Sequence, residues 1–400
     1  MKVKFFQLLL SLLAVSFIPY NEVKAQQAKP IVVVTDCYHP YQDPGDNLDL
    51  INGYSNPDVD LKAVILDITD AFRKDTANHA VLWKDPRGPR EAGLIPVSQM
   101  NYIFDKNIPF AIGPLTSMTS EEDKMEYIPQ YEQAGVQLLL DILRSADQPI
   151  DVLSFGSARI LAVAYNREPE LMRTKINQIH LSAGTASKDY ETGSDLGANM
   201  ISGGEWNVAL DVYAFTRILR SDLPVAIYPC AGKDGGYVKD VNNSYWELKD
   251  MSFLKRMDCP LQNYLDYALN KKLAFDFLQQ MDQGCAFAKE DRPLPETFHI
   301  WETAVWQHVT GKDIVKTKEG TYLFRNSGEH KEGDSYVDSS LKPCRLEVRD
   351  DGRFRFEYVE DSNFKIFYRS NPEENERALN AIIPNVFMQI KVNDNRINKK

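Results

Sequence analysis

Residues 32–51 read VVVTDCYHPYQDPGDNLDLI, and this stretch carries the clearest structural signal in the chain. Its opening run of β-branched residues is typical of a strand that is buried on both faces. The run ends at Asp36, and Asp43, Asp46 and Asp49 follow it closely. The segment DNLDLINGY then has the apolar spacing of a helix. The stretch therefore predicts a buried strand, a loop rich in carboxylates, and a helix.

Outward from this stretch, short apolar strands alternate with helical segments. Six buried strands are expected, at PIVVVTD (30–36), LKAVILDI (61–68), IPFAIG (108–113), IDVLSFG (150–156), NQIHLSAG (177–184) and LPVAIYPC (223–230). Helices are expected at ARILAVAYNREPELM (158–172) and NVALDVYAFTRILRS (207–221). This alternation predicts an α/β fold with an open, mostly parallel, Rossmann-like sheet and helices on both faces.

The pattern changes near Lys316, where apolar residues begin to recur with a period of two. The segments YLFRN, CRLEVRD, RFRFEYV and KIFYRS show it, around Asn-Ser-Gly and Asp-Asp-Gly turns. Antiparallel strands are expected there, either as a small appendage or as an edge extension of the main sheet. The expected organisation is a signal peptide at 1–25, an α/β domain at 26–315, and a β-rich C-terminal extension at 316–400 packed on that domain.

The first 25 residues have the features of a cleavable signal peptide. Lys2 and Lys4 precede an apolar run at 5–18, and Val23 and Ala25 supply the small residues of a cleavage site. We therefore expect export to the periplasm or the extracellular space. No later segment approaches the ~20 apolar residues that a membrane helix needs. The five cysteines leave room for one or two disulfides, but the sequence does not indicate the pairing.

The balance of charge bears on the kind of partner. The formal net charge of −11 argues against nucleic acid and against an anionic membrane surface, since both repel an acidic protein. A small-molecule ligand is the expected partner, and the sequence leaves the oligomeric state open.

Carboxylates and amides cluster where the expected strands end, which is where open parallel sheets bind ligands. They are Asp36, Asp43, Asp46, Asp67, Asp70, Asn199, Glu205 and Asn207, with Glu302 further along the chain. Oxygen ligands without paired His or Cys suit a hard cation such as Ca²⁺. The alternative for any single aspartate is a turn or a helix cap.

Three stretches of the sequence resemble the inosine–uridine nucleoside hydrolase (ribohydrolase) family. The first is VVVTD…DPGDNLDLI followed by NPDVDLKAVIL, and the second is IDVLSFGSARILAVAYNREPELMRTKINQIHLSAG. The third, ANMISGGEWNVALDVYAF, has Asn199, Glu205 and Asn207 at matching intervals. KIFYRSNPEENERALNAII is similar to the closing strand and helix of the family. The resemblance identifies the chain as a divergent, secreted member.

The resemblance implies a Ca²⁺ site. Asp36 would be a ligand and the general base for the attacking water, and Asp46 a second ligand. The backbone carbonyl of Arg159 and the carboxylate of Glu302 would complete the ligand set.

The same resemblance implies a sugar site. Asn199, Glu205 and Asn207 would hold the sugar hydroxyls, and Asp70 stands where the family has an asparagine. Either Asp43 or Gly45 takes the position of the ribose-diol aspartate; Asp43 is favoured, because glycine offers no acceptor. Trp301 stands at the position of the family's late histidine, and His299 is a candidate leaving-group acid nearby.

The implied activity is hydrolysis of an N-glycosidic, ribosyl-type bond by a Ca²⁺-activated water, through an oxocarbenium-like transition state. The substrate would be a nucleoside or another glycoside. Two alternatives remain: a non-catalytic sugar-binding protein on the same scaffold, and a glycosidase that uses two carboxylates without metal.

Several neighbouring side chains have a structural interpretation instead. The aromatic residues Trp206, Trp301, Trp306, Tyr237 and Tyr245 would stack on a base or sugar, or belong to the core. Asp49 is expected to face solvent from its helix, and Cys37 to be a small packing residue.

Overall fold

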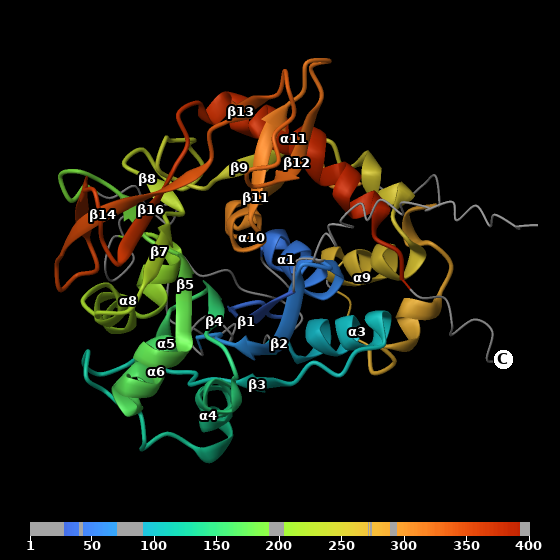
Figure 1. Cartoon of the computed structure of the whole chain (residues 1–400). Coiled ribbons are helices and arrows are strands. Elements are labelled where there is room, and N and C mark those ends of the chain that lie inside the picture. Colours follow the sequence, from blue (N-terminus) through green and yellow to red (C-terminus); the bar gives the residue numbers. More distant parts are fainter. Residues whose placement is uncertain are drawn as a thin grey trace, which may run out of the picture.

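A nine-stranded sheet forms the centre of the molecule (Figure 1). The computed structural model describes residues 28–39, 43–69, 91–191, 204–270, 272, 274–288 and 294–392. The strand order is β15-β14-β16-β7-β5-β4-β1-β2-β3. These strands are β1 (Lys29–Thr35), β2 (Val59–Leu66), β3 (Phe110–Ile112), β4 (Ile150–Phe155), β5 (Ile176–Ser182), β7 (Val225–Tyr228), β14 (Ser340–Val348), β15 (Phe354–Tyr358) and β16 (Phe364–Tyr368). Pairing is parallel from β16 to β3.

The six strands expected from the sequence all lie in the parallel part of the sheet, which confirms the α/β fold. β1 lies between β2 and β4, so both of its faces are covered. Ile31 and Val33 belong to one hydrophobic core, and Val32 and Val34 to the other. Alternate residues of a strand point to opposite faces, and this explains why every position of the run is apolar.

Helices cover both faces of the sheet (Figure 1). The core on one face includes residues of α1 (Pro44–Ser55), α3 (Leu94–Phe104), α9 (Cys259–Leu269), α10 (Thr303–Val309) and α11 (Pro372–Gln389). The core on the other face includes residues of α4 (Gln130–Ser145), α5 (Arg159–Arg167), α6 (Pro169–Lys175) and α8 (Val212–Leu219). The short helix α7 (Trp206–Leu210) precedes α8.

The two helices expected at 158–172 and 207–221 are interrupted. The segment 158–172 contains α5 and the start of α6, with Pro169 as the first residue of α6. Proline is favoured at that position because it lacks the N–H that a helix start leaves unpaired. The segment 207–221 contains most of α7 and all of α8, separated by Asp211, whose side chain accepts a bond from Ala214 N at 3.1 Å. Asp211 thereby caps α8 and ends α7.

The C-terminal strands fall into two groups. β11 (Lys312–Lys316) pairs antiparallel with β12 (Tyr322–Asn326) and β13 (Ser335–Val337) in a separate sheet. β14, β15 and β16 extend the edge of the main sheet. β16 pairs antiparallel with β14, as expected, and its other edge pairs parallel with β7, which the sequence pattern did not indicate. The helix α11 follows β16, as the family's closing strand and helix implied.

The remaining elements are short. Two two-stranded sheets pair β9 (Trp246–Leu248) with β10 (Phe298–Ile300), and β6 (Thr185–Ala186) with β8 (Ala231–Gly232). Three 3₁₀ helices, η1 (Ser252–Arg256), η2 (Gln279–Asp282) and η3 (Ala286–Ala288), lie between β9 and β10 along the chain. Within the described ranges, no helix has the length and apolar character needed to cross a membrane.

The structure supplies the cysteine pairing that the sequence left open. Cys259, at the start of α9, forms a disulfide with Cys285, and their Cα atoms lie 4.4 Å apart. Cys37, Cys230 and Cys344 are buried and lie outside this disulfide. Cys37 has a pKa raised well above its usual value, chiefly by burial, so its thiol stays protonated. This agrees with the packing role expected for Cys37.

Candidate functional site

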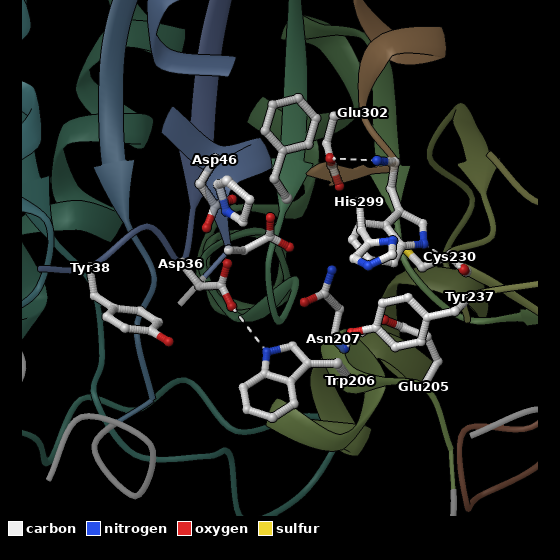
Figure 2. Close-up of a pocket in the computed structure, with 14 residues that line it drawn as sticks. Asp36, Tyr38, Asp46, Glu205, Trp206, Asn207, Cys230, Tyr237, His299 and Glu302 are labelled. Carbon is white, nitrogen blue, oxygen red and sulfur yellow. Dashed lines mark hydrogen bonds between the residues drawn. The ribbon is translucent and has the colours of Figure 1, made fainter. Parts of the chain in front are cut away.

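A pocket lies beyond the carboxyl ends of the parallel strands (Figure 2). Its volume is about 190 Å³. Asp36, which follows β1, and Phe155, the last residue of β4, both line it. The full lining is Asp36, Tyr38, Asp43, Pro44, Asp46, Phe155, Glu205, Trp206, Asn207, Cys230, Tyr237, His299, Trp301 and Glu302.

Most of the candidate residues named from the sequence meet in this pocket. They are Asp36, Asp43, Asp46, Glu205, Asn207, His299 and Glu302. Arg159 does not line it. Asp70 and Asn199, like the expected signal peptide at 1–25, lie outside the described residues.

The N-terminus of α1 supplies two of the carboxylates. Asp43 is the N-cap of α1, and its Oδ1 accepts a hydrogen bond from Gly45 N at 2.7 Å. Asp46 lies in the first turn of α1, where a negative charge is favoured by the helix dipole. Asp43 therefore caps the helix and also lines the pocket, so the two interpretations of this residue are compatible.

Glu302 comes from the junction between β10 and α10. Its Oε1 accepts a bond from Ser182 Oγ at 3.1 Å, and its Oε2 accepts one from Trp301 N at 3.1 Å. A Cβ atom added to Gly45 would lie 3.0 Å from Asp43 Oδ1 and 3.5 Å from Glu302 Oε2. The carboxylates of Asp43 and Glu302 thus approach the same point at the start of α1, where a side chain at position 45 would be closely packed.

The clustered carboxylates raise one another's pKa values. Burial and, to a lesser extent, the nearby carboxylate of Asp67 raise the pKa of Asp36 to about 7. Burial, with the charge of Asp43, raises the pKa of Glu302 to about 8. The pKa of Asp46 is raised well above its usual value by burial and then by the charge of Asp36. No lysine or arginine is among the described residues that line the pocket, so this negative charge is not compensated there.

The chemistry of these side chains fits a hard cation. A divalent ion would compensate the buried carboxylates, and oxygen ligands are those that Ca²⁺ prefers. In the described part of the chain, however, no three His, Cys, Asp or Glu side chains form a group that could hold a metal. The ligand set of Asp36, Asp46, Glu302 and the Arg159 carbonyl therefore stays a prediction.

Glu205 and Asn207 are held by the start of α7. Glu205 is the N-cap of this helix, and its carboxylate accepts bonds from Gly184 N at 2.7 Å and Asn207 N at 3.0 Å. Asn207 donates from Nδ2 to the carbonyl oxygen of Ser182 at 2.8 Å. Trp206 donates from Nε1 to Asp36 Oδ2 at 3.3 Å, which connects α7 to the end of β1.

Aromatic side chains form the side of the pocket that faces Asp36 and Asp46 (Figure 2). Trp301 donates from Nε1 to Cys230 O at 2.8 Å. The ring of Tyr237 meets that of His299 edge-on at 4.8 Å between centroids. Of the five aromatic residues named from the sequence, Trp206, Trp301 and Tyr237 line the pocket, whereas Tyr245 and Trp306 are buried outside its lining.

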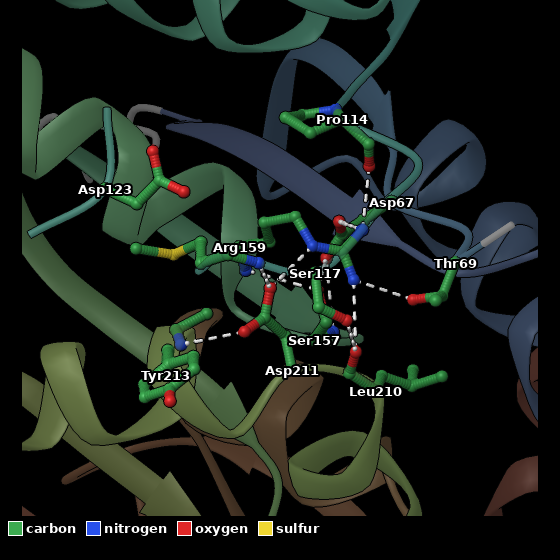
Figure 3. Close-up of polar contacts among 12 residues, drawn as sticks. Asp67, Thr69, Pro114, Ser117, Asp123, Ser157, Arg159, Leu210, Asp211 and Tyr213 are labelled. Carbon is green, nitrogen blue, oxygen red and sulfur yellow. Dashed lines mark hydrogen bonds and ion pairs between the residues drawn. The ribbon is translucent and has the colours of Figure 1, made fainter. Parts of the chain in front are cut away.

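Arg159 has a role that the sequence did not suggest (Figure 3). Its fully buried guanidinium donates to Asp211 Oδ2 at 2.8 Å, Pro114 O at 2.7 Å and Thr69 Oγ1 at 2.7 Å. It also lies 3.8 Å from Asp67 Oδ1. These partners belong to the segments that follow β2 and β3 and to the junction of α7 and α8. Arg159 thus connects the segments behind the pocket through its side chain.

The expectation for Asp49 is wrong. Asp49 is buried rather than solvent-facing, and its Oδ1 accepts a bond from Trp306 Nε1 at 2.7 Å. Trp306 belongs to α10, and the residues of α1 and α10 share one hydrophobic core. Burial raises the pKa of Asp49 well above its usual value. The apolar spacing of α1 could not reveal this, because it does not show which helix covers the polar side.

An open parallel sheet with an acidic pocket at its strand ends is typical of α/β proteins that bind a small ligand there. No family model matches the sequence. The chain is 27% identical over 206 residues to pyrimidine-specific ribonucleoside hydrolases RihA of Salmonella enteritidis PT4 and Salmonella typhi. The match covers 50% of this chain and 60% of each relative. The family that these relatives represent is the one that the motifs resemble.

Two solved structures of nucleoside hydrolases are similar to this chain at a low level. An inosine-uridine preferring nucleoside hydrolase from Bacillus anthracis covers 91% of this chain, with a TM-score of 0.46 and 12% identity. The plant nucleoside hydrolase PpNRh1 covers 88%, with a TM-score of 0.48 and 14% identity. Likeness at this level bears on neither the activity nor the substrate of this chain.

Proposed function

We propose that this protein hydrolyses an N-glycosidic bond of a nucleoside or a related glycoside. One observation supports this most strongly: Asp36, Asp46, Glu205, Asn207 and Glu302 line a single pocket at the strand ends. Their order along the chain is that of the motifs shared with the nucleoside hydrolases. The named activity of the relatives, ribonucleoside hydrolysis, is extended to this chain only as part of this proposal, since the match spans 60% of their length.

In the proposed reaction Asp36 is the general base. Trp206 holds one carboxylate oxygen of Asp36 at 3.3 Å and so restricts its orientation. Asp36 would accept the proton of a water molecule as that water attacks the anomeric carbon.

Glu205 and Asn207 would bind the sugar hydroxyls. The carboxylate of Glu205 is oriented by two backbone N–H groups, and the amide of Asn207 by the carbonyl of Ser182. The buried carboxylates around Asp36 would stabilise the positive charge that develops on the sugar in an oxocarbenium-like transition state. His299, which bonds Tyr245 through Nδ1 at 2.8 Å, lines the same pocket and is the candidate acid for the leaving group.

We further propose that Ca²⁺ binds between Asp36, Asp46 and Glu302. A bound divalent ion would compensate their charge and lower the pKa of a coordinated water.

The test is a measurement of released reducing sugar. Purified protein is incubated with inosine, uridine and 4-nitrophenyl β-D-ribofuranoside, after chelation and after Ca²⁺ is restored. We expect release that chelation abolishes and Ca²⁺ restores. Release that survives chelation would indicate a metal-independent glycosidase.

A second candidate is a sugar-binding protein without turnover. It is favoured by the absence of a metal-ligand group among the described side chains. Ribose or nucleoside binding in calorimetry, with no sugar released under any condition, would replace the first proposal by this one.

We also propose that the protein is exported, with residues 1–25 removed. The Cys259–Cys285 disulfide supports this, because disulfides persist in oxidising compartments. Cell fractionation followed by mass spectrometry of the intact protein tests it. A full-length chain that remains in the cytoplasm would contradict it.

A further inference from the structure

The turn between β14 and β15 packs against the helix that carries two candidate sugar-binding residues. Hydrogen bonds from Gly352 N to Arg349 O at 3.1 Å and from Arg349 N to Arg353 O at 2.8 Å close this turn, residues 349–353. Gly352 has a φ of +81°, a conformation that glycine adopts more readily than other residues. A Cβ atom there would lie 2.5 Å from Cγ1 of Val208, a buried residue of α7. The backbone of the turn therefore packs directly on α7.

The first residue of β15 continues this contact toward the end of β5. A Cβ atom on Gly184 would lie 2.9 Å from Phe354 Cε1 and 2.9 Å from Phe215 Cζ. The rings of Phe354 and Phe215 lie 6.1 Å apart between centroids. The N–H of Gly184 donates to Glu205 Oε2 at 2.7 Å. These two rings thus pack behind a backbone group that orients the Glu205 carboxylate.

The turn is also fixed to the end of α8. Arg220, the C-cap of α8, donates from Nη2 to Val348 O at 2.9 Å and to Asp350 Oδ1 at 2.7 Å. Only Asp211 separates α7 from α8, so the turn is attached to both helices. It cannot move away from α7 without losing the bonds to Arg220.

The helix α7 depends on such contacts for its position. It has only five residues, and isolated helices shorter than ~12–15 residues are marginal in water. Its pocket side is held by the bond from Asn207 to Ser182 O. At its end, Leu210 O accepts bonds from Arg159 Nη2 at 3.2 Å and Ser117 Oγ at 3.0 Å (Figure 3). The β14–β15 turn adds a contact from the C-terminal strands to these.

We propose that the β14–β15 turn is a positioning element: by packing Gly352 on Val208, it holds α7 so that Glu205 and Asn207 face the pocket. Residues 349–353 are not among the described residues that line this pocket, so the turn acts through α7. The inference rests on the proposed function for the sugar-binding role of Glu205 and Asn207. It deepens that proposal by giving the C-terminal strands a task at the site.

The test adds one methyl group to the turn. Gly352→Ala places this methyl against Val208 and should displace α7. Gly320→Ala is the matched control, because Gly320 has a φ of +85° and a Cβ atom there would meet no heavy atom of the described chain within 4 Å. Both variants carry the same kind of backbone strain, and only the first adds a contact with α7.

The first readout is spectroscopic and does not depend on turnover. Trp206 is the first residue of α7, so its environment reports the position of the helix. Fluorine NMR of the fluorotryptophan-labelled protein measures it, with the resonance assigned by Trp206→Phe. We expect Gly352→Ala to shift this resonance and Gly320→Ala to leave it in place. The double variant Gly352→Ala/Val208→Ala, which makes room for the new methyl, should bring the resonance to its position in Val208→Ala.

The second readout is the dependence of activity on the sugar hydroxyls. It compares the nucleoside that the wild type cleaves with its deoxy analogues, each of which lacks one hydroxyl. Gly352→Ala should lower the ratio of kcat/KM between nucleoside and analogue by about tenfold or more for at least one analogue, roughly the effect of losing one hydrogen bond to a charged group. A general loss of stability would lower both values together and keep the ratio.

The outcomes separate the inference from the proposed function. If no nucleoside is hydrolysed, the proposed function fails, and the Trp206 resonance still decides whether the turn positions α7. An unchanged resonance in a Gly352→Ala variant with native circular dichroism would overturn the inference, as would an equal shift in Gly320→Ala. If Gly352→Ala does not fold, Val208→Ala removes the same contact without added strain. A Trp206 resonance that Val208→Ala leaves unchanged would then overturn the inference.

Discussion

At the scale of single residues, one side chain of the pocket often has both a structural and a chemical task. Asp43 caps α1 and Glu205 caps α7, and both line the pocket. A helix N-terminus presents N–H groups that orient a carboxylate, so a cap is already a fixed oxygen ligand. The choice between a capping aspartate and a binding aspartate is therefore not exclusive in this protein.

Asp36 differs from these caps, because its carboxylate is buried and receives a bond from the indole of Trp206. We predict that Asp36→Asn lowers kcat by roughly 10²–10⁴-fold, since the amide cannot accept the proton of the attacking water. Kinetics of sugar release with the substrate that the wild type cleaves would measure it. Asp60→Asn, at a surface aspartate paired with Lys62, should keep full activity. An Asp36→Asn variant with activity near that of the wild type would remove Asp36 from the mechanism.

At the scale of elements, a buried polar chain connects the sheet to α10. His180 of β5 bonds through Nδ1 to Tyr228 OH at 3.1 Å, and Tyr228 OH bonds to His308 Nδ1 at 3.0 Å. His308 in turn bonds through Nε2 to Ser339 O at 3.0 Å. Because a carbonyl only accepts, Nε2 of His308 carries a hydrogen, and its Nδ1 accepts from Tyr228 when the ring is neutral. These hydrogen bonds thus favour a neutral His308 within α10, the helix that begins after Glu302.

This arrangement predicts a loss of stability in mild acid. Burial lowers the pKa of His308 from 6.5 to about 4, so the unfolded state binds more protons between these values. The contribution of the neutral His308 ring to the unfolding free energy is complete above pH 6.5 and is lost as the pH falls toward 4. Between pH 7 and pH 5, the unfolding free energy of the wild type should fall by roughly 2 kcal/mol more than that of the His308→Gln variant.

Urea unfolding at the two pH values measures this difference. His330→Gln is the matched control, because His330 is more exposed, with a side chain that is 39% accessible, and pairs with Asp313. The unfolding free energy of His330→Gln should depend on pH in the same way as that of the wild type. Equal pH dependence in the wild type and His308→Gln would contradict the prediction.

At the scale of the whole molecule, the pocket is formed by segments far apart in the sequence. Residues from the ends of β1 and β4, from α1 and α7, and from the junction of β10 and α10 all line it. The two cores hold these segments at one edge of the sheet. The result is a buried negative charge that one bound cation would compensate.

Ca²⁺ should therefore stabilise the folded protein. Binding to the native state alone contributes about 2.7 kcal/mol at a ligand concentration of 100 Kd. We predict a rise in Tm on adding Ca²⁺ to the chelated wild type, with little or no rise in Asp46→Asn or Glu302→Gln. Differential scanning calorimetry measures the shift in Tm. The control variant Asp60→Asn should show the same rise in Tm as the wild type. A wild-type Tm that does not respond to Ca²⁺ would count against the proposed site.

The disulfide should stabilise the region of α9. It joins residues 26 apart, and loops of this size contribute about 2–4 kcal/mol in the chain-entropy account. The double variant Cys259→Ala/Cys285→Ala should lose about this much unfolding free energy in urea. Reductant should destabilise the wild type and leave the double variant unchanged. A wild type that is insensitive to reductant under unfolding conditions would show that the bridge is not formed.

Local patterns were sufficient for the main elements of the sheet and for much of the pocket. The six parallel strands were read from apolar runs, because a strand buried on both faces must be apolar at every position. Asp36, Asp43, Asp46, Glu205, Asn207, His299 and Glu302 were named from strand ends and motifs, and all line one pocket. The interruption of the second predicted helix at Asp211 was missed, because the apolar spacing continues through the break.

What only the tertiary structure decided depends on contacts between distant segments. The parallel placement of β16 beside β7, the burial of Asp49 under Trp306 and the buried bonds of Arg159 are contacts of this kind. So is the backbone pairing of His39 with Glu91. The sequence alone indicated which side chains gather at the carboxyl ends of the strands. Packing decided which side chains face one another, because a local pattern records the burial of a residue but not its partner.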